Sequence, residues 1–203
     1  MNLPHRPRTM LLRALLALSL GALPLLSGCS KPQNEIRRLQ QEVWQRPGDT
    51  ATLLSLANAY ARSKQYDLAA ETYLEALKLD PELDAAYHSL GAVRFNQERY
   101  PEARDWFQKH LERAPSDSLR HYDLGNALMQ LKDYRGAAAA YEGAIEHSHA
   151  FTEAHYNLAV CFTHLGRMTE ARQIYDWLLD KNNYLAVSLQ SHLKGEKPDV
   201  RKP

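Results

Sequence analysis

The 203-residue sequence is long enough for one domain with a hydrophobic core, and its 25 Lys and Arg nearly balance its 24 Asp and Glu. This composition argues against the clustered positive charge of a nucleic-acid-binding protein, so no nucleic-acid partner is expected. Two cysteines are too few for a disulfide framework.

Residues 1–28 have the pattern of a signal peptide. Arg6, Arg8 and Arg13 come first, without acidic residues, and the mostly apolar run "ALLALSLGALPLL" follows. That run is too short to span a bilayer comfortably and is typical of the apolar region of a secretory signal. The alternative is an anchor helix that remains attached, which Gly21 and Pro24 disfavour. The sequence therefore predicts removal of this segment.

The next feature is the tetrapeptide Leu26-Ser27-Gly28-Cys29, which resembles the lipobox of bacterial lipoproteins. The resemblance implies a diacylglycerol on the Cys29 sulfur, cleavage before this residue and a fatty acid such as palmitate on the new amino terminus. Ser30 rather than Asp after the cysteine resembles an outer-membrane sorting signal. The expected location is the cell envelope, on the outer membrane facing the periplasm, with residues 29–34 as a lipidated linker. The alternative is an ordinary, unmodified thiol.

From Thr50 onwards the chain repeats every 34 residues, which predicts the four units 50–83, 84–117, 118–151 and 152–183. Position 8 of the units is always small, position 20 is always alanine, and position 24 is always aromatic. These positions are, in order, Ala57, Gly91, Gly125 and Ala159, then Ala69, Ala103, Ala137 and Ala171, then Tyr73, Phe107, Tyr141 and Tyr175.

Each unit has the apolar spacing of two amphipathic helices, with Pro81 and Pro115 ending the second helix of units one and two. Small residues at positions 8 and 20 allow the two helices to approach closely. The pattern resembles the tetratricopeptide repeat, which implies an all-α solenoid of stacked antiparallel helix pairs. The stretch "EHSHAF" lacks the expected proline, so the junction of units three and four is expected to be longer or looser without losing the register.

Both ends of the array fit the caps that a stack of repeats requires. Residues 35–49 predict an N-terminal capping helix and turn with Ile36, Leu39 and Val43 on one stripe. Residues 184–194 predict a C-terminal capping helix with its leucines at helical spacing. Residues 195–203 are polar and predict a disordered tail.

No catalytic constellation stands out, so the chain is predicted not to be an enzyme, and no cofactor or small-molecule substrate is expected beyond the lipid on Cys29. The histidines of "HSHAFTEAH" raise the alternative of a metal site built from His147, His149, Glu153 and His155. We favour no metal, because His155 falls on a core position and the other two histidines lie in a junction. Cys161 predicts a buried, inert thiol.

A concave groove is the remaining candidate site, because in tetratricopeptide arrays the first helices line such a groove through positions 2, 5, 9, 12 and 13. The expected protein-binding residues combine aromatic, amide and apolar side chains suited to a peptide segment or a helix of a partner. They are Leu54, Asn58, Arg62, His88, Phe95, Asn96, Tyr122, Asn126, Met129, Gln130, Tyr156, Thr163 and His164. The alternative is that some of these residues only face water.

The groove lacks the carboxylate clamp of chaperone adaptors. Of the five residues of that clamp, only Asn58 matches when units one to three are aligned with it, and Asp123 has the wrong charge. A chaperone C-terminus is therefore not the expected ligand.

The sequence therefore predicts a membrane-anchored scaffold of the bacterial envelope, which binds a protein or peptide in its groove and the membrane through its lipid. It is expected to support assembly of a complex such as a pilus or secretion machine. The alternative is a docking subunit for a cell-wall or cytochrome maturation enzyme.

Overall fold

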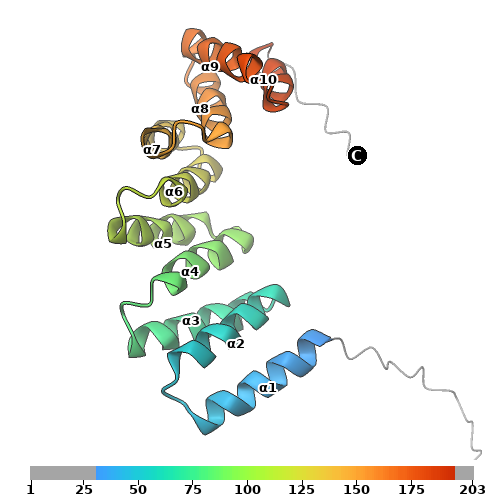
Figure 1. The fold of residues 1–203 in the computed structure, drawn as a ribbon, viewed down its shortest axis with the longest axis vertical. Helices are drawn as coiled ribbons and strands as arrows, with labels where there is room; N and C mark the ends of the chain where they lie inside the picture. The colour runs from blue at the N-terminus through green and yellow to red at the C-terminus, as the bar shows by residue number, and fades with distance from the viewer. Residues whose placement is uncertain (1–30, 195–203) are drawn as a thin grey trace, which may run out of the picture.

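The computed structural model describes residues 31–194, which form ten α-helices and no strand (Figure 1). Their bounds are α1 Lys31–Gln45, α2 Thr50–Arg62, α3 Tyr66–Leu79, α4 Asp84–Asn96, α5 Tyr100–Arg113, α6 Ser118–Gln130, α7 Tyr134–His147, α8 Thr152–His164, α9 Met168–Asp180 and α10 Leu185–Leu193. Each helix packs mainly on its neighbours in the chain, and the pairs rise one after another from α1 to α10. The predicted all-α solenoid is confirmed.

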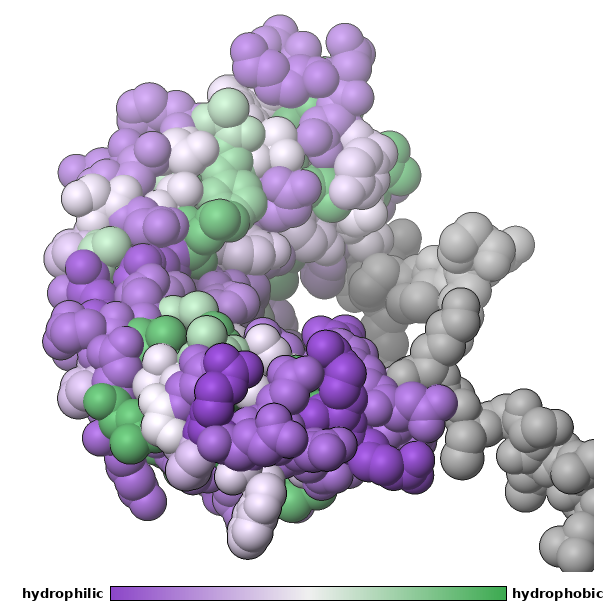
Figure 2. Space-filling model, turned by 60° about the horizontal axis from the view of Figure 1, so that its bottom comes forward, coloured by the Kyte–Doolittle hydropathy of each residue, from purple (hydrophilic) through white to green (hydrophobic). Residues whose placement is uncertain are grey.

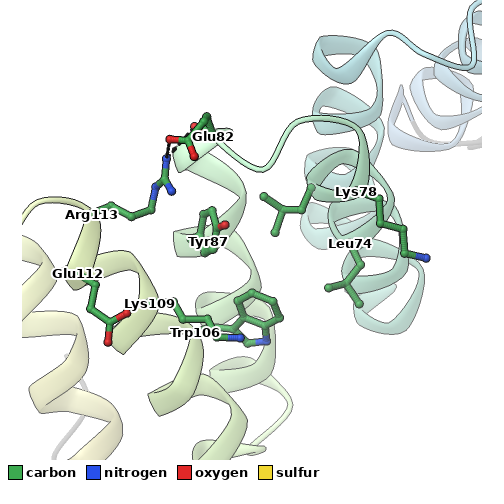
Figure 3. Close-up of a pocket in the computed structure, with 9 residues that line it drawn as sticks. Leu74, Lys78, Glu82, Tyr87, Trp106, Lys109, Glu112 and Arg113 are labelled. Carbon is green, nitrogen blue, oxygen red and sulfur yellow. Dashed lines mark hydrogen bonds and ion pairs between the residues drawn. The ribbon is translucent and has the colours of Figure 1, made fainter.

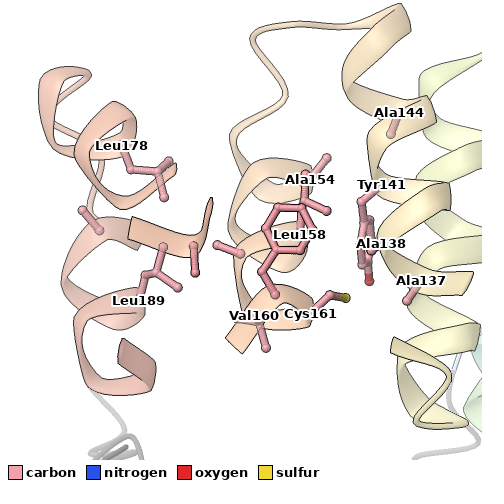
Figure 4. Packing of buried hydrophobic residues seen from close by; sticks show 14 residues of the cluster. Ala137, Ala138, Tyr141, Ala144, Ala154, Leu158, Val160, Cys161, Leu178 and Leu189 are labelled. Carbon is pink, nitrogen blue, oxygen red and sulfur yellow. The ribbon is translucent and has the colours of Figure 1, made fainter. Parts of the chain in front are cut away.

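The core runs along the stack rather than collecting at one centre. Three clusters of buried residues follow one another, the first beneath α1 to α4 and the last between α7 and α10. In the last cluster, Tyr141 of α7 and Cys161 of α8 lie side by side, and Leu178 and Leu189 close the far end (Figure 4). Each unit therefore depends on its neighbours to bury its apolar surface.

Close approach within a unit depends on the small residue at position 8. A Cβ atom placed on Gly91 would lie 2.5 Å from the Phe107 ring, and one on Gly125 would lie 2.6 Å from the Tyr141 ring. Since real Cβ atoms essentially never come that near, the aromatic side chain occupies the space that a larger residue would need. The predicted close approach of the two helices at position 8 is confirmed in units two and three.

The turn inside each unit has the same backbone conformation four times, at position 15. Its residue has a positive φ: 59° at Lys64, 59° at Glu98, 60° at Lys132 and 75° at Gly166. Glycine adopts this left-handed region without steric cost, whereas the other three residues do so at some cost. The three-residue turn between the helices is therefore imposed by packing, not by the local sequence.

The turns between units share a hydrogen bond from the side chain at position 4. The Tyr87 hydroxyl donates to the carbonyl oxygen of Pro81 at 2.9 Å, and His121 and His155 reach the carbonyls of Pro115 and His149 at 2.7 and 3.0 Å. The expectation of a longer junction between units three and four is wrong. Ser148 to Phe151 form a loop of the same length as the preceding one, because His149 replaces proline without changing the turn.

The N-terminal capping helix begins earlier than predicted. Helix α1 starts at Lys31, so residues 31–34, expected as a linker, are helical. Pro32 is compatible with this, because the first turn of a helix does not need its missing N–H group. Ile36 and Leu39 are buried against α2 as expected, and Val43 is half-buried.

The C-terminal cap is α10, whose Ala186 and Leu189 are buried against α8 and α9. Cys29, the signal peptide of residues 1–28 and the tail of residues 195–203 lie outside the described residues. Within residues 31–194, none of the helices combines the length and apolar character needed to cross a bilayer.

Candidate protein-binding groove

The described residues curve around a hollow, and hydrophobic side chains appear in small separate groups on a mostly polar surface (Figure 2). The first helices of neighbouring units are joined by side-chain contacts. His88 of α4 lies 3.2 Å from the Asp123 carboxylate of α6, and Asn157 of α8 donates to Asn126 of α6 at 3.3 Å. These contacts form a continuous polar strip along α4, α6 and α8.

Two of the predicted groove asparagines are held by the aromatic residue of their own unit. The Tyr73 hydroxyl donates to Asn58 Oδ1 at 2.6 Å, and the Tyr141 hydroxyl donates to Asn126 Oδ1 at 2.9 Å. A free asparagine side chain offers a ligand both a donor and an acceptor. In the structure the Asn58 oxygen already accepts one hydrogen bond and the Asn126 oxygen accepts two, from Tyr141 and Asn157, so at Asn126 the amide hydrogens are the groups that remain for a partner.

Unit two lacks this asparagine–tyrosine pair and contains a cavity in its place. Position 9 is Ala92 and position 24 is Phe107, so neither the amide nor the hydroxyl is present. A cavity of about 160 Å³ opens between α4, α5 and α6. Its lining residues are His88, Ala92, Phe95, Asn96, Phe107, Asp123 and Asn126.

The cavity unites four predicted groove residues, His88, Phe95, Asn96 and Asn126. Sequence reasoning missed Phe107, which was assigned only to the core, and Asp123. The signal that would have found the cavity is the simultaneous loss of asparagine at position 9 and of the hydroxyl at position 24.

The three groove aromatics are less free than predicted, because each is half-buried and has an intramolecular partner. Phe95 packs edge-on against Tyr100, with ring centroids 5.3 Å apart. The Tyr122 ring lies 4.7 Å from that of Phe151, and the Tyr156 hydroxyl lies 3.2 Å from His192 Nε2 in the C-terminal cap. Of these, only Phe95 lines the cavity.

The remaining predicted residues do not line the cavity. Arg62 forms a 2.8 Å ion pair with Glu35 of α1, and the His164 ring stacks on Tyr134 at 4.0 Å between centroids. Thr163 donates its hydroxyl to the Val160 carbonyl. Leu54 and Met129 are half-buried beside the core clusters, and Gln130 is exposed. The structure thus concentrates the site at α4 to α6 and does not bring all thirteen residues together.

An ionic cluster supports the floor of this region. Arg120 of α6 donates to both oxygens of Asp84, at 3.0 and 2.8 Å, and also to the carbonyl of His110 at 2.7 Å. Burial opposes ionisation of Asp84, but the hydrogen bonds and positive charge of Arg120 together with the contributions of His110 and Arg113 outweigh it, and the pKa of this carboxyl is lowered. The cluster therefore ties α4, α5 and α6 together through charged groups.

Two histidines of the cluster have pKa shifts of opposite direction. The hydrogen bond to Asp123 raises the pKa of His88, whereas burial and the nearby Arg120 lower the pKa of His110. His110 lies 3.5 Å from Asp84 through Nε2, and its buried Nδ1 has no hydrogen-bond partner among the described residues. Protonation of His110 would place a second N–H group in that unpaired position.

A pH dependence of stability follows for His110. The pKa of His110 in the folded state lies below the unfolded value of about 6.5. Its contribution to the free energy of unfolding is therefore complete above that pH and is lost as the pH falls. The pKa of His88 is raised, so its contribution to the free energy of unfolding has the opposite pH dependence and is lost as the pH rises. We expect His110→Ala to lose less unfolding free energy between pH 7 and pH 5 than the wild type.

The measurement is urea denaturation at both pH values. Alanine is compatible with this position, since Ala76 and Ala144 occupy it in units one and three. Equal acid losses for the two proteins would show that His110 is not the responsible group.

The histidines of the alternative metal site do not point towards a common position. The His147 ring lies 5.4 Å from that of His121, and His155 packs on Trp177 at 4.0 Å between centroids. Within residues 31–194, no three His, Cys, Asp or Glu residues are placed to hold a metal ion. Cys161 is fully buried, as predicted, and burial raises the pKa of its thiol to about 12. A thiol in that environment is inert at neutral pH.

Comparison with known proteins places this architecture in a family. The model of the tetratricopeptide repeat family matches residues 54–118 and 122–186. The chain is similar to anaphase-promoting complex subunit 6 of Arabidopsis thaliana, at 29% identity over 104 residues and 49% of this chain. It is also similar to the small glutamine-rich tetratricopeptide repeat-containing protein 2 of Mycosarcoma maydis, at 32% identity over 85 residues and 42% of this chain. The chain spans only 19% and 24% of the length of these two relatives.

Solved structures with a similar fold include MamA from Desulfovibrio magneticus RS-1, with a TM-score of 0.69, 21% identity, and coverage of 73% of this chain and 84% of that one. YrrB, a protein with an unusual peptide-binding site, gives a TM-score of 0.62 at 22% identity, with 81% and 95% covered. PilF of Pseudomonas aeruginosa gives 0.65 at 20% identity, with 80% and 77% covered. The stacked helix pairs, the four registered units and the family match agree, and the chain belongs to the tetratricopeptide repeat family.

Proposed function

We propose that this chain is a lipid-anchored, non-enzymatic scaffold of a bacterial cell envelope, which helps a larger envelope machine such as a pilus or secretion system to assemble. Its membership of a family of protein-interaction scaffolds supports the general role. The lipobox at Leu26–Cys29 supports the anchor and the location, and the similarity in fold to PilF is compatible with an envelope pathway.

The observation that carries the binding role is the cavity of unit two. Its floor is apolar, from Ala92, Phe95 and Phe107, and its rim is polar, with His88 and Asp123. Binding sites commonly combine an apolar floor with a few polar groups that fix orientation. An apolar cavity of about 150 Å³ in another protein takes up benzene, so this one is large enough for one aliphatic or aromatic side chain of a partner.

The chain itself provides the variant that tests this role. Ala92→Asn combined with Phe107→Tyr recreates in unit two the pair that units one and three already contain, with the hydroxyl donating to the amide oxygen. The replacement fills the cavity by an arrangement the fold accepts twice. We expect the variant to fold normally and to lose its partner.

The experiment is affinity capture of the full chain from mildly cross-linked native envelopes, with the captured proteins identified by mass spectrometry. Ala139→Asn is the control, because Ala139 is an exposed residue of α7. We expect one envelope component to be captured by the wild type and the control and depleted at least about tenfold with the double variant. Unchanged capture by the double variant would place the binding site elsewhere, and an absence of envelope proteins would contradict the scaffold role.

A further inference from the structure

A second, larger hollow lies between the second helices of units one and two (Figure 3), and it shares no lining residue with the cavity of unit two. This notch has a volume of about 660 Å³ and lies between α3, α5 and the start of α4. Leu74 and Leu77 come from α3, Trp106 from α5, and the half-buried Tyr87 packs against Trp106 with ring centroids 6.0 Å apart. The notch thus has an apolar floor open to the surface.

Comparison of the units shows that this floor is not a general property of the repeat. Leu74 is at position 25, where the later units have Gln108, Glu142 and Asp176. Trp106 is at position 23, where the other units have Thr72, Ala140 and Ile174. Two departures, one in each neighbouring unit, therefore meet in the same notch. The hollow beside Gln108 is built differently, because its apolar residues, Leu124 and Leu128, come from the first helix of unit three.

Three basic residues, Lys78, Lys109 and Arg113, and two acidic residues, Glu82 and Glu112, line the notch, so its net positive charge favours an acidic ligand. Arg113 is already engaged, with Glu82 at 2.7 Å and Asp84 at 3.1 Å, and it stacks on Tyr87. Lys78 and Lys109, which line the notch, form no ion pair with a carboxylate among the described residues, and Lys109 Nζ lies 4.3 Å from the centre of the Trp106 ring. The Glu112 carboxylate accepts a hydrogen bond from Gln108 at 3.2 Å. Two ammonium groups at the edge of an apolar floor are therefore available to a partner.

We propose that this notch binds an acidic, apolar segment of a partner protein. The segment places an aliphatic or aromatic side chain on Leu74, Leu77 and Trp106 and directs flanking carboxylates towards Lys78 and Lys109. Exposed ion pairs alone contribute little to affinity, so the apolar contact supplies the binding energy and the lysines supply selectivity. The site is independent of the cavity of unit two, and the protein can hold two partners at once.

The test measures binding of short synthetic peptides to the full chain in detergent, by fluorescence anisotropy. One peptide carries the pattern Glu-Leu-Leu-Glu, and its controls carry Lys-Leu-Leu-Lys and Glu-Ser-Ser-Glu. The disrupting variant is Leu74→Gln with Trp106→Ala, which copies the residues at these positions in units two and three and so preserves a known arrangement. Lys78→Glu with Lys109→Glu is a second variant that leaves the floor intact.

We expect the acidic, apolar peptide to bind at least about tenfold more tightly than both controls. The two notch variants, Leu74→Gln with Trp106→Ala and Lys78→Glu with Lys109→Glu, should each weaken binding of this peptide by about tenfold or more. The cavity variant, Ala92→Asn with Phe107→Tyr, should leave its binding unchanged. Loss of peptide binding with that last variant would assign the peptide to the groove and overturn the proposal, as would equal binding of the three peptides.

Two further results would also overturn it. One is binding of phosphatidylglycerol vesicles that depends on both lysines while no peptide binds, which would assign the notch to the membrane. The other is concentration-dependent self-association in sedimentation that Leu74→Gln with Trp106→Ala abolishes, which would assign it to a second copy.

Discussion

Replacement of Gly91 by leucine is expected to destabilise the fold by about 1–3 kcal/mol or more, the usual cost of overpacking a core. Even a single Cβ atom at this position would lie 2.5 Å from the Phe107 ring, which is itself buried between α4 and α5. The leucine side chain must displace either the ring or the helix pair. Urea denaturation is the measurement, and the midpoint should fall without a change in slope if folding remains two-state.

Gly48→Leu is the matched control. Gly48 lies in the exposed turn after α1, and a Cβ atom there would meet no atom within 4 Å. Its substitution should change the unfolding free energy by less than about 0.5 kcal/mol, as is usual for surface positions. Equal stability of Gly91→Leu and the wild type would mean that α4 and α5 can separate at little cost, contrary to the packing described here.

Replacement of Cys29 by serine is expected to release the protein from membranes almost completely. The proposed lipid is attached through the sulfur, and each buried CH₂ group of an acyl chain contributes about 0.8 kcal/mol to membrane binding. A single chain anchors only reversibly, whereas two or more hold a protein stably, so their loss has a far larger effect than a surface mutation. The measurement is fractionation of cells into soluble and membrane fractions, followed by immunoblotting.

Cys161→Ser provides the control, because it removes the other cysteine while leaving the lipobox intact. That variant should stay in the membrane fraction. Retention of Cys29→Ser in the membrane would contradict the lipid anchor and favour the alternative in which the apolar segment before it remains attached as a helix.

The repeat, its register and its helix pairs follow from the sequence alone, because they depend on contacts within about 34 residues. Small residues at position 8, alanine at position 20 and an aromatic at position 24 recur in the same order, and each pair is close in the chain. The stripes of Ile36 and Leu39 and of Leu189 likewise predicted both caps. The sequence also indicated the burial of Cys161, since it falls between apolar positions of a first helix.

Contacts that cross from one unit to another were decided only by the tertiary structure. The pairing of His88 with Asp123, the coordination of Asp84 by Arg120 and the meeting of Leu74 with Trp106 each join residues about 30 or more positions apart. The repeat pattern gives the place of each residue within its unit, but the rotation between units determines which side chains meet. For the same reason the groove prediction was spread over thirteen residues, while the cavity lies at α4 to α6.

The left-handed turns and the cavity of unit two were likewise decided by the tertiary structure. Lys64, Glu98 and Lys132 carry no local signal for a positive φ, yet the docking of the two helices fixes that conformation. The cavity exists because two substitutions, at Ala92 and Phe107, face each other across a helix pair. Short-range periodicity therefore determined the helices and their order, and long-range packing determined the surfaces that a partner can use.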